Sequence, residues 1–339
     1  MGGQRIRVWR NANRTGQIDL TKQGNVVPGT LYVEGVAPSA TARDVELRLE
    51  YDENPPGQNN SLFKCEDRVR LTVIKVETIK FRIGTASEWK DFAKPQKILL
   101  GKVSHLRAMD IQPPGVALPS GFPAWQGTYG VTASGIEVTH TYSGAPSASD
   151  ADTKTVTTEG GPAAPEEFLV CTKVLGIHSN VDPDAGFTSG HAWVSVTDYS
   201  YGSPVTTTYG LWPDAHPNVP DNGPDSDVRI GLEPATGLHN RFFLLSPSQY
   251  NAFVTFRQSH AEWSYIYTCA NWAEDAYRAG TAETVDSSDN VLFGTPRKIS
   301  ASIVVLETDN PTTSDMPFEG GEDASSSSSG SSWGGSSFT

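Results

Sequence analysis

Cysteine and long apolar runs are both scarce in this chain of 339 residues. Only three cysteines occur, Cys65, Cys171 and Cys269, and their wide spacing excludes a disulfide framework, although one pair could still form. No stretch of about 18 apolar residues is present, so we expect no transmembrane segment. The amino-terminal stretch lacks the apolar core of a secretory signal. Secretion or delivery to the cell envelope would then use a signal-peptide-independent route, and the protein is otherwise expected in the cytoplasm.

Positive charge is also in short supply. The chain carries 26 Lys and Arg against 39 Asp and Glu, a net charge of −13, which argues against a protein that holds nucleic acid through its phosphates. The charge is unevenly spread, because residues 1–110 carry 18 Lys and Arg against 13 Asp and Glu, whereas the remainder is strongly acidic. Such a break predicts separate modules, as does a chain of this length.

Signatures of metal and phosphate chemistry are missing as well. The seven histidines show no zinc-type spacing, and neither a glycine-rich phosphate loop nor a Gly-x-Ser-x-Gly nucleophile turn occurs. Asn180, Asp182 and Asp184 resemble the start of a calcium loop, but the glycine and the closing glutamate are not at the required spacing. We therefore expect no metal ion and no organic cofactor.

Alternating apolar and polar residues, typical of half-buried antiparallel strands, dominate the first half of the chain. These runs, separated by Pro- and Gly-rich turns, predict a β-sandwich over residues 1–80 and a second β module over residues 81–162. The second module resembles bacterial immunoglobulin-like repeats in the order of Trp125 and segments 130–142 and 152–158.

Residues 163–308 change character, with strand-like runs followed by two helical patterns. Ser246 is the predicted cap of the first helix, and Thr268 that of a second helix that begins at Cys269 and stops at Gly280. Beyond residue 308 the chain is rich in Ser and Gly and has little apolar surface to bury. A disordered tail is therefore expected over residues 309–339.

Two residues of the third region are candidates for nucleophilic catalysis. Cys269 would lie at a helix start, where unpaired N–H groups and the helix dipole favour a thiolate. His191 follows a glycine at the start of a strand, and an imidazole beside a thiol can accept its proton and later protonate a leaving group. Taken singly, each residue also has a structural interpretation: a small buried hydrophobe for Cys269 and a backbone-bonded imidazole for His191.

The order of these two residues resembles a known enzyme branch. A strand-borne histidine in Gly190-His-Ala-Trp193, followed by a helix start in Thr268-Cys-Ala-Asn-Trp-Ala273, resembles circularly permuted papain-like thiol hydrolases. That branch includes permuted NlpC/P60 and lecithin–retinol acyltransferase-like proteins, and the resemblance covers residues 166–300. Thr268 stands where the branch usually has Asn, and Trp272 where it usually has Phe.

The resemblance implies a fold class and a function. The fold would be mainly β and multi-domain, with two β-sandwich modules, an α+β papain-like domain over residues 163–308 and the disordered tail. The function would be hydrolysis of amide bonds in peptidoglycan peptides, as in secreted effectors that act on bacteria. Expected partners are a peptide or cell-wall substrate and a secretion-apparatus or immunity protein.

A third residue should orient the imidazole. Antiparallel pairing of the following strand would bring the region of Trp212 beside His191, which makes Asp214 the first candidate. His216 is the second candidate and Asn271 the third. A simple turn role is the alternative interpretation of Asp214.

Aromatic residues near these positions are candidates for substrate binding. Trp193, Trp212 and Trp272 could line a groove, with core packing as the alternative. Two other functions stay open at this point. One is a thiol acyltransferase or lipid-ester hydrolase on the same permuted fold. The other is a non-catalytic surface or assembly protein with a degenerate papain-like domain.

Overall fold

The computed structural model describes residues 5–19, 30–52, 64–84, 86, 88–93, 95–128, 133–143, 148–162, 164–214, 216, 218–223, 226–259, 261–289 and 293–312. The chain is mainly β, with several sheets and few helices, as the sequence predicts. It divides into two compact units, each built from interleaved segments. The first unit comprises Met1–Phe81, His105–Thr139 and Thr155–Glu166, and the second comprises Arg82–Ser104, His140–Lys154 and Glu167–Thr339. The three predicted domain boundaries stay predictions.

The amino-terminal strands form two small sheets. Strands β1 (Ile6–Trp9), β2 (Gln17–Ile18) and β3 (Tyr32–Gly35) make an antiparallel sheet in the order β2-β1-β3. Strands β4 (Val45–Asp52) and β5 (Lys64–Leu71) pair antiparallel with each other. The buried apolar side chains of this part are Ile6, Val8, Ile18 and Val45. Alternation in the sequence predicts strands over residues 31–34, 45–51 and 69–76. The first two correspond to β3 and β4, whereas β5 shares only residues 69–71 with the third, and β1 and β2 are not predicted.

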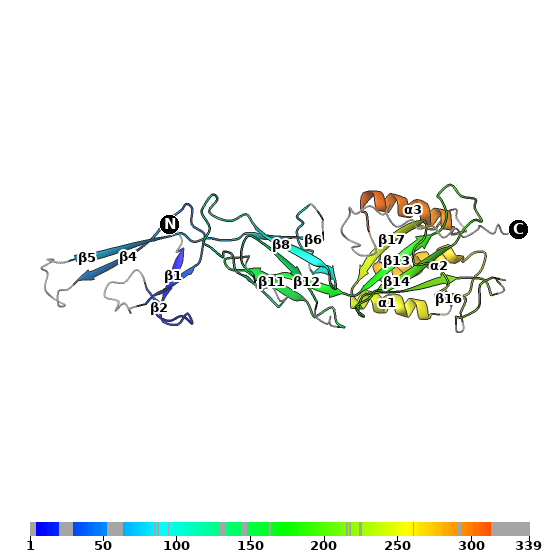
Figure 1. The fold of residues 1–339 in the computed structure, drawn as a ribbon, viewed down its shortest axis with the longest axis horizontal. Coiled ribbons are helices and arrows are strands. Elements are labelled where there is room, and N and C mark those ends of the chain that lie inside the picture. Colours follow the sequence, from blue (N-terminus) through cyan, green and yellow to red (C-terminus); the bar gives the residue numbers. More distant parts are fainter. Residues whose placement is uncertain are drawn as a thin grey trace. The chain divides into compact units, whose positions relative to one another are not determined.

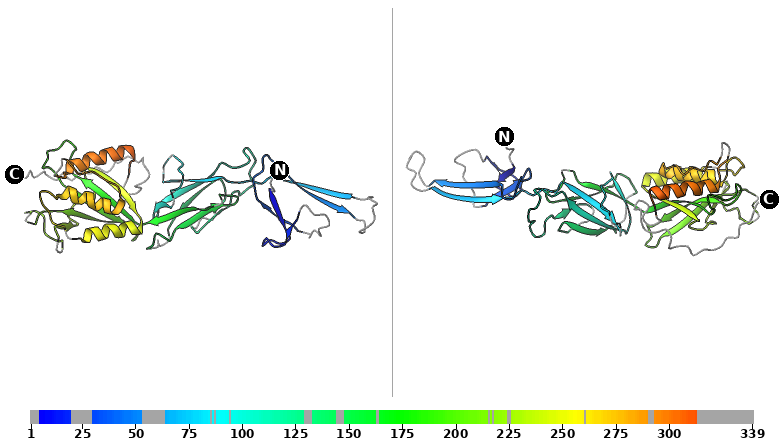
Figure 2. Two further views of the ribbon diagram at one scale, coloured as in Figure 1. Left: turned by 180° about the vertical axis from the view of Figure 1, so that it is seen from behind. Right: turned by 90° about the horizontal axis from the view of Figure 1, so that it is seen from above.

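Seven strands follow before the larger sheet. They are β6 (Thr78–Ile83), β7 (Gln96–Leu99), β8 (Val103–Met109), β9 (Trp125–Gln126), β10 (Glu137–Thr141), β11 (Lys154–Thr158) and β12 (Glu166–Cys171). They form one sheet in the order β10-β8-β6 and another in the order β7-β12-β11-β9 (Figures 1 and 2). Every second side chain of β6 is buried, although the sequence analysis names no strand there. Residues 130–132 of the predicted 130–142 segment lie outside the described residues.

The second unit is organised around a five-stranded antiparallel sheet. Its strands are β13 (Lys173–Ser179), β14 (Ala192–Asp198), β15 (Val205–Leu211), β16 (Val228–Ile230) and β17 (His239–Leu245), in the order β16-β15-β14-β13-β17. Consecutive strands β13 to β16 therefore lie side by side. The predicted run from residue 167 to residue 177 is two strands, β12 and β13, which are separated at Thr172.

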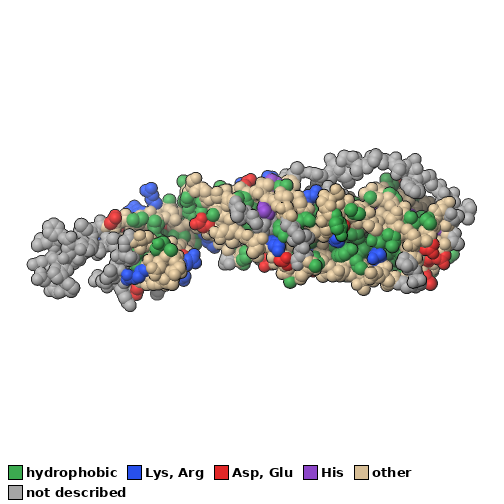
Figure 3. All heavy atoms as spheres, turned by 60° about the horizontal axis from the view of Figure 1, so that its bottom comes forward, with side chains coloured by type: hydrophobic (Ala, Val, Ile, Leu, Met, Phe, Trp, Pro, Cys, Tyr) green, Lys and Arg blue, Asp and Glu red, His purple; other side chains and the backbone are tan. Residues whose placement is uncertain are grey.

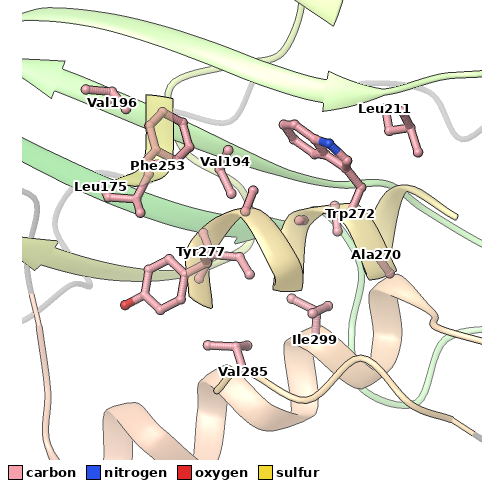
Figure 4. Packing of buried hydrophobic residues seen from close by; sticks show 14 of the residues in the cluster. Leu175, Val194, Val196, Leu211, Phe253, Ala270, Trp272, Tyr277, Val285 and Ile299 are labelled. Atoms are coloured by element: carbon pink, nitrogen blue, oxygen red, sulfur yellow. The ribbon is translucent and has the colours of Figure 1, made fainter. Parts of the chain in front are cut away.

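Three helices cover one face of this sheet, as Figures 1 and 2 show. They are α1 (Pro247–Gln258), α2 (Cys269–Thr281) and α3 (Pro296–Asp309). Helix α2 packs between α1 and α3 and buries Trp272, Ala273, Ala276 and Tyr277 against the sheet. Figure 4 shows Trp272 and Tyr277 in one cluster with Leu175, Val194 and Leu211 of the sheet and Ile299 of α3. Burial of this apolar surface fixes the distance between α2 and the sheet.

The predicted caps of α1 and α2 are confirmed. The Ser246 hydroxyl accepts from the Gln249 N–H, and the Gln249 side chain accepts from the Ser246 N–H. Thr268 and Asn271 make the same reciprocal pair at the start of α2. Helix α3 was not predicted, although Thr295 caps it and Pro296 occupies its first position.

Gly280 does not end helix α2, which is a correction to the prediction. The helix continues to Thr281, and Ala282 adopts the left-handed conformation instead. Gly280 is needed for close packing: a Cβ there would lie 2.9 Å from Leu175 Cδ2 and 3.2 Å from Phe253 Cβ. The glycine therefore lets α2 approach both the sheet and α1.

The end of helix α3 is fixed by a buried ion-pair network. The Arg241 guanidinium donates to the carboxylates of Glu283 and Glu307 at 2.6–2.8 Å. Thr312 donates its N–H to Glu307 and accepts the N–H of Phe242. The ordered chain thus extends four residues into the predicted tail, whose remaining residues, 313–339, lie outside the described ranges.

The surface of the second unit carries several exposed apolar side chains among polar ones, and Figure 3 shows one face of the molecule with both kinds. Within the described ranges, no helix is both long enough and apolar enough to cross a membrane.

Replacing Gly280 by Ala is expected to destabilise the second unit. Alanine normally favours a helix over glycine, but the added methyl must displace Leu175 and Phe253 in a packed core, which costs about 1–3 kcal/mol. Chemical denaturation measures the change. Val305→Ala, at a position 60% exposed on α3, is the control, with an expected effect within about 0.5 kcal/mol. A stabilised Gly280→Ala variant would contradict the packing argument.

Candidate active site

Cys269 is the first residue of helix α2, as predicted. The Thr268 hydroxyl caps the helix by accepting from the Ala270 N–H at 3.3 Å, and it donates to the Gly294 carbonyl at 2.8 Å. The capping box therefore anchors the turn before the cysteine to a second segment of the chain. Cys269 as a whole residue is half-buried.

His191 lies directly before strand β14. Its backbone N–H donates to Asn180 Oδ1 at 2.7 Å, so the Asn180 side chain, part of the suggested calcium loop, serves instead to hold the histidine. Gly190 precedes it with a φ of +87°, and a Cβ there would lie 2.2 Å from Val181. This turn therefore requires glycine, and it directs the following imidazole toward the start of α2.

The structure brings Cys269 and His191 into hydrogen-bond contact. Burial alone would raise the pKa of Cys269, but the His191 ring and the N–H groups of Ala192 and Ala270 outweigh it and lower the pKa. Burial alone would lower the pKa of His191, but the charges and hydrogen bonds of Cys269 and Glu233 raise it to about 9. Both shifts favour a thiolate–imidazolium ion pair.

Glu233 lies against the other side of the imidazole. Its Oε1 is 3.3 Å from His191 Nε2 and accepts from Trp212 Nε1 at 2.8 Å. Burial would raise the pKa of this carboxyl, yet the hydrogen bonds from His191 and Trp212 lower it, so the group is ionised near neutral pH. Because Nε2 faces the carboxylate, Nδ1 is the ring nitrogen left for the thiol.

A glycine makes room for this contact. A Cβ on Gly210 of strand β15 would lie 1.9 Å from Glu233 Oε1 and 2.7 Å from His191 Nε2. Strand register alone does not explain the proximity, because β14 and β16 both pair antiparallel with β15 and so run in the same direction. The chain turns back after β16 at Gly231, which has a φ of +72°, and this turn brings Glu233 to His191. Gly210 thus lies between the strand that follows His191 and the strand that precedes Glu233.

Asp214, the predicted orienting residue, does not contact His191. Its side chain is 86% exposed, and its carboxylate lies 4.0 Å from the guanidinium of Arg229. The predicted register is correct, since Trp212 does lie beside His191, but the chain turns outward after Trp212 and carries Asp214 away. Glu233 occupies the position that the sequence analysis assigned to Asp214.

The two other candidates for that role also have different places. His216 packs edge-on against Trp212, with ring centroids 4.9 Å apart, and not against His191. Asn271 accepts from the Thr268 N–H and completes the capping box of α2. A Cβ on Gly294 would lie within 2.7 Å of the Asn271 amide, so that side chain is firmly enclosed.

The three predicted substrate-binding tryptophans divide into two groups. Trp193 and Trp272 are each 1% exposed, so neither offers a surface to a substrate. Trp272 packs in the core under the sheet, and Trp193 donates its indole N–H to the Pro234 carbonyl at 3.0 Å. Trp212 is half-buried and contacts His191 and Glu233.

Sequence reasoning missed Glu233, although a signal was present. The strand 228–232 was predicted, and Glu233 follows it directly in Gly231-Leu-Glu-Pro234. Gly231 adopts a φ of +72°, and Thr208 Oγ1 donates to the Glu233 carbonyl, so the chain turns back after β16 and brings Glu233 to His191. The three predicted candidates, Asp214, His216 and Asn271, lie instead after β15 and on α2.

A second histidine lies deeper in the same sheet. His178 bonds Asn240 Oδ1 and Ser195 Oγ, both at 2.7 Å, and is fully buried. Desolvation lowers its pKa to about 4, so the ring is neutral. This triplet is enclosed and has no access to a substrate, and it serves to satisfy polar groups inside the fold.

Among the described residues, no group of three or more His, Cys, Asp or Glu is arranged as a metal-ligand set. The chemistry available at the site is that of its own side chains: a polarised thiol, an imidazole in contact with it, and a buried carboxylate behind the imidazole. These three groups in contact suit attack by sulfur on an electrophilic carbon, followed by proton transfer to a leaving group.

Comparisons with protein-family models, with curated proteins and with solved structures find no match for this chain.

Substitution of Gly210 by Ala is expected to disrupt the contacts among Cys269, His191 and Glu233. The added methyl overlaps Glu233 Oε1, so the carboxylate must leave His191 and the thiol pKa must rise. The measurement is the rate of iodoacetamide alkylation of Cys269 at pH 6.5, read by peptide mass spectrometry, with an expected fall of about tenfold for each pKa unit. Cys171 is an internal reference, because burial raises its pKa to about 12.

Gly186→Ala is the matched control, since a Cβ there meets only the Ser189 hydroxyl at 3.1 Å. Its alkylation rate should equal that of the unmodified protein. If Gly210→Ala also left the rate unchanged, Glu233 would not influence the thiol.

Proposed function

We propose that the second unit is a circularly permuted papain-like domain that hydrolyses amide bonds, with Cys269 as nucleophile, His191 as base and Glu233 as the carboxylate that orients it. The hydrogen bond between the Cys269 thiol and the His191 ring carries this proposal. Chain order supports it, since the histidine-bearing strand precedes the cysteine-bearing helix. The immunoglobulin-like character of the β modules is likewise a proposal, supported by their strand pattern.

The proposed reaction begins with attack of the Cys269 thiolate on the substrate carbonyl carbon, which forms a C–S bond and moves an electron pair to oxygen. The backbone N–H of Cys269 at the helix start is the donor for that oxyanion. Collapse breaks the C–N bond, and the His191 imidazolium gives its proton to the departing amine. Water then attacks the thioester with His191 as base, which releases the acid and restores the thiol.

We propose peptidoglycan peptides as the substrate, in keeping with the resemblance to permuted NlpC/P60 enzymes. The role would be that of an effector delivered to the bacterial envelope without a signal peptide, with a secretion-apparatus or immunity protein as partner. The β modules would then serve in delivery or attachment.

A thiol acyltransferase or lipid-ester hydrolase is the second candidate, and one observation favours it. Tyr265 and Ile266 are 80% and 70% exposed on a tight turn in which Ser264 and Tyr267 exchange backbone hydrogen bonds. This apolar tip lies a few residues before Cys269. Exposed apolar side chains next to a nucleophile suit an acyl chain as well as a peptide.

Three substitutions test the proposed function. Cys269→Ala should lower turnover of isolated sacculi by roughly 10³-fold or more, because the nucleophile is gone. Glu233→Gln should lower it by roughly 10²- to 10⁴-fold, because a neutral amide no longer orients and stabilises the imidazolium. Asp214→Asn should leave turnover within about twofold, because its exposed side chain has no contact with His191. Mass spectrometry of released muropeptides gives the rates.

Circular dichroism should show the same fold for all three variants. Release of acyl groups from lipid esters, without any release of muropeptides, would favour the second candidate function. Full activity of Cys269→Ala on both substrates would remove the thiol mechanism altogether.

A further inference from the structure

Trp212 contacts both neighbours of the nucleophile. Its indole Nε1–H donates to Glu233 Oε1 at 2.8 Å, and its ring centroid lies 4.0 Å from that of His191 at an interplanar angle of 30°. One side chain therefore touches the carboxylate through its edge and the imidazole through its face.

The Glu233 carboxylate is held in place by the Trp212 indole N–H more than by the backbone of Glu233. The Glu233 carbonyl accepts from Thr208 Oγ1 at 3.0 Å, and the next carbonyl, of Pro234, accepts from Trp193. These two bonds fix the main chain, and the Glu233 backbone N–H also bonds its own carboxylate. Apart from His191, the Trp212 indole is the side-chain donor that holds Oε1 in place.

The position of Trp212 is itself set by the sheet. Its backbone N–H donates to the Asp227 carbonyl at 3.0 Å, which continues the pairing of β15 with β16 beyond Leu211. The Asp227 carboxylate in turn accepts from the N–H of Trp263 at 2.6 Å, on the segment that leads to Cys269. The backbone of Trp212 is thus tied to Asp227, just before β16, and through Asp227 to the segment that leads to Cys269.

We propose that Trp212 is a positioning residue for the proposed hydrolase: its N–H holds the Glu233 carboxylate against His191, and its ring face stabilises the imidazolium. A protonated imidazole over an indole gains from the negative face of the ring, as other cations do. The inference rests on the proposed function and gives Trp212 a role different from substrate binding.

The charged and titratable groups around the imidazole agree with this arrangement. Cys269 on α2 and Glu233 after β16 both favour the protonated ring. His216, on the segment after β15, would oppose protonation if it were charged, but burial together with His191 lowers the pKa of His216, so that ring is neutral near pH 7. His178, on β13, is neutral as well. The ring face of Trp212 therefore meets a cation while both of these histidines are neutral.

The test is the pH dependence of Cys269 alkylation by iodoacetamide, followed by peptide mass spectrometry, which needs no substrate. The unmodified protein should show an apparent thiol pKa well below the ordinary value of about 8.5. Trp212→Phe keeps an aromatic face but loses the donor, so the apparent thiol pKa should rise by about one unit. Trp212→Leu loses both contacts, so its apparent thiol pKa should rise further, while the second apparent pKa, that of the imidazole, should fall.

Trp125→Phe is the matched control, because Trp125 is also buried and also donates its indole N–H at 2.8 Å, to the Gly135 carbonyl. It should leave the alkylation profile unchanged. An unchanged profile in both folded Trp212 variants would overturn the role of Trp212 alone. An ordinary thiol pKa in the unmodified protein would overturn the proposed function itself.

Discussion

The structure of the second unit converges on one interaction, the hydrogen bond between the Cys269 thiol and the His191 imidazole. Burial works against charge on both groups, so the pair is ionised only because each partner, the helix-start N–H groups and the Glu233 carboxylate compensate for lost hydration. Removal of any one of these contributions returns both pKa values toward their ordinary ranges. The capped helix, the glycine turn and the strand register all serve to keep these groups together.

Three adjacent antiparallel strands supply the geometry. His191 precedes β14, Gly210 lies on β15 without a side chain in the way, and the turn at Gly231 after β16 folds Glu233 back against His191. The core beneath α2 then brings the helix start to the start of β14. The sheet thus carries the imidazole and the carboxylate, and a helix carries the thiol, which makes their separation depend on packing.

Part of this arrangement can be predicted from the sequence. The residues that can be predicted carry local signals, and those that cannot are placed by tertiary contacts. Cys269 and His191 carry local signals, a cap before one and a glycine before the other, and the caps at Ser246 and Thr268 are local too. Glu233 is missed because its place depends on the turn after β16 that folds the chain back toward His191, and the exposed position of Asp214 follows from an outward turn that has no local signature. Gly280 continues its helix because tertiary packing against Leu175 overrides the usual role of glycine as a stop.

The protonation state of His191 tests the central claim most directly. Nuclear magnetic resonance titration of the labelled imidazole gives its pKa in the unmodified protein and in Cys269→Ser. The ion-pair account predicts a ring that stays protonated through pH 7.5 in the unmodified protein, in line with a pKa raised to about 9, and a clearly lower pKa once the thiolate is gone. A ring that titrates near 6.5 in both proteins would contradict it.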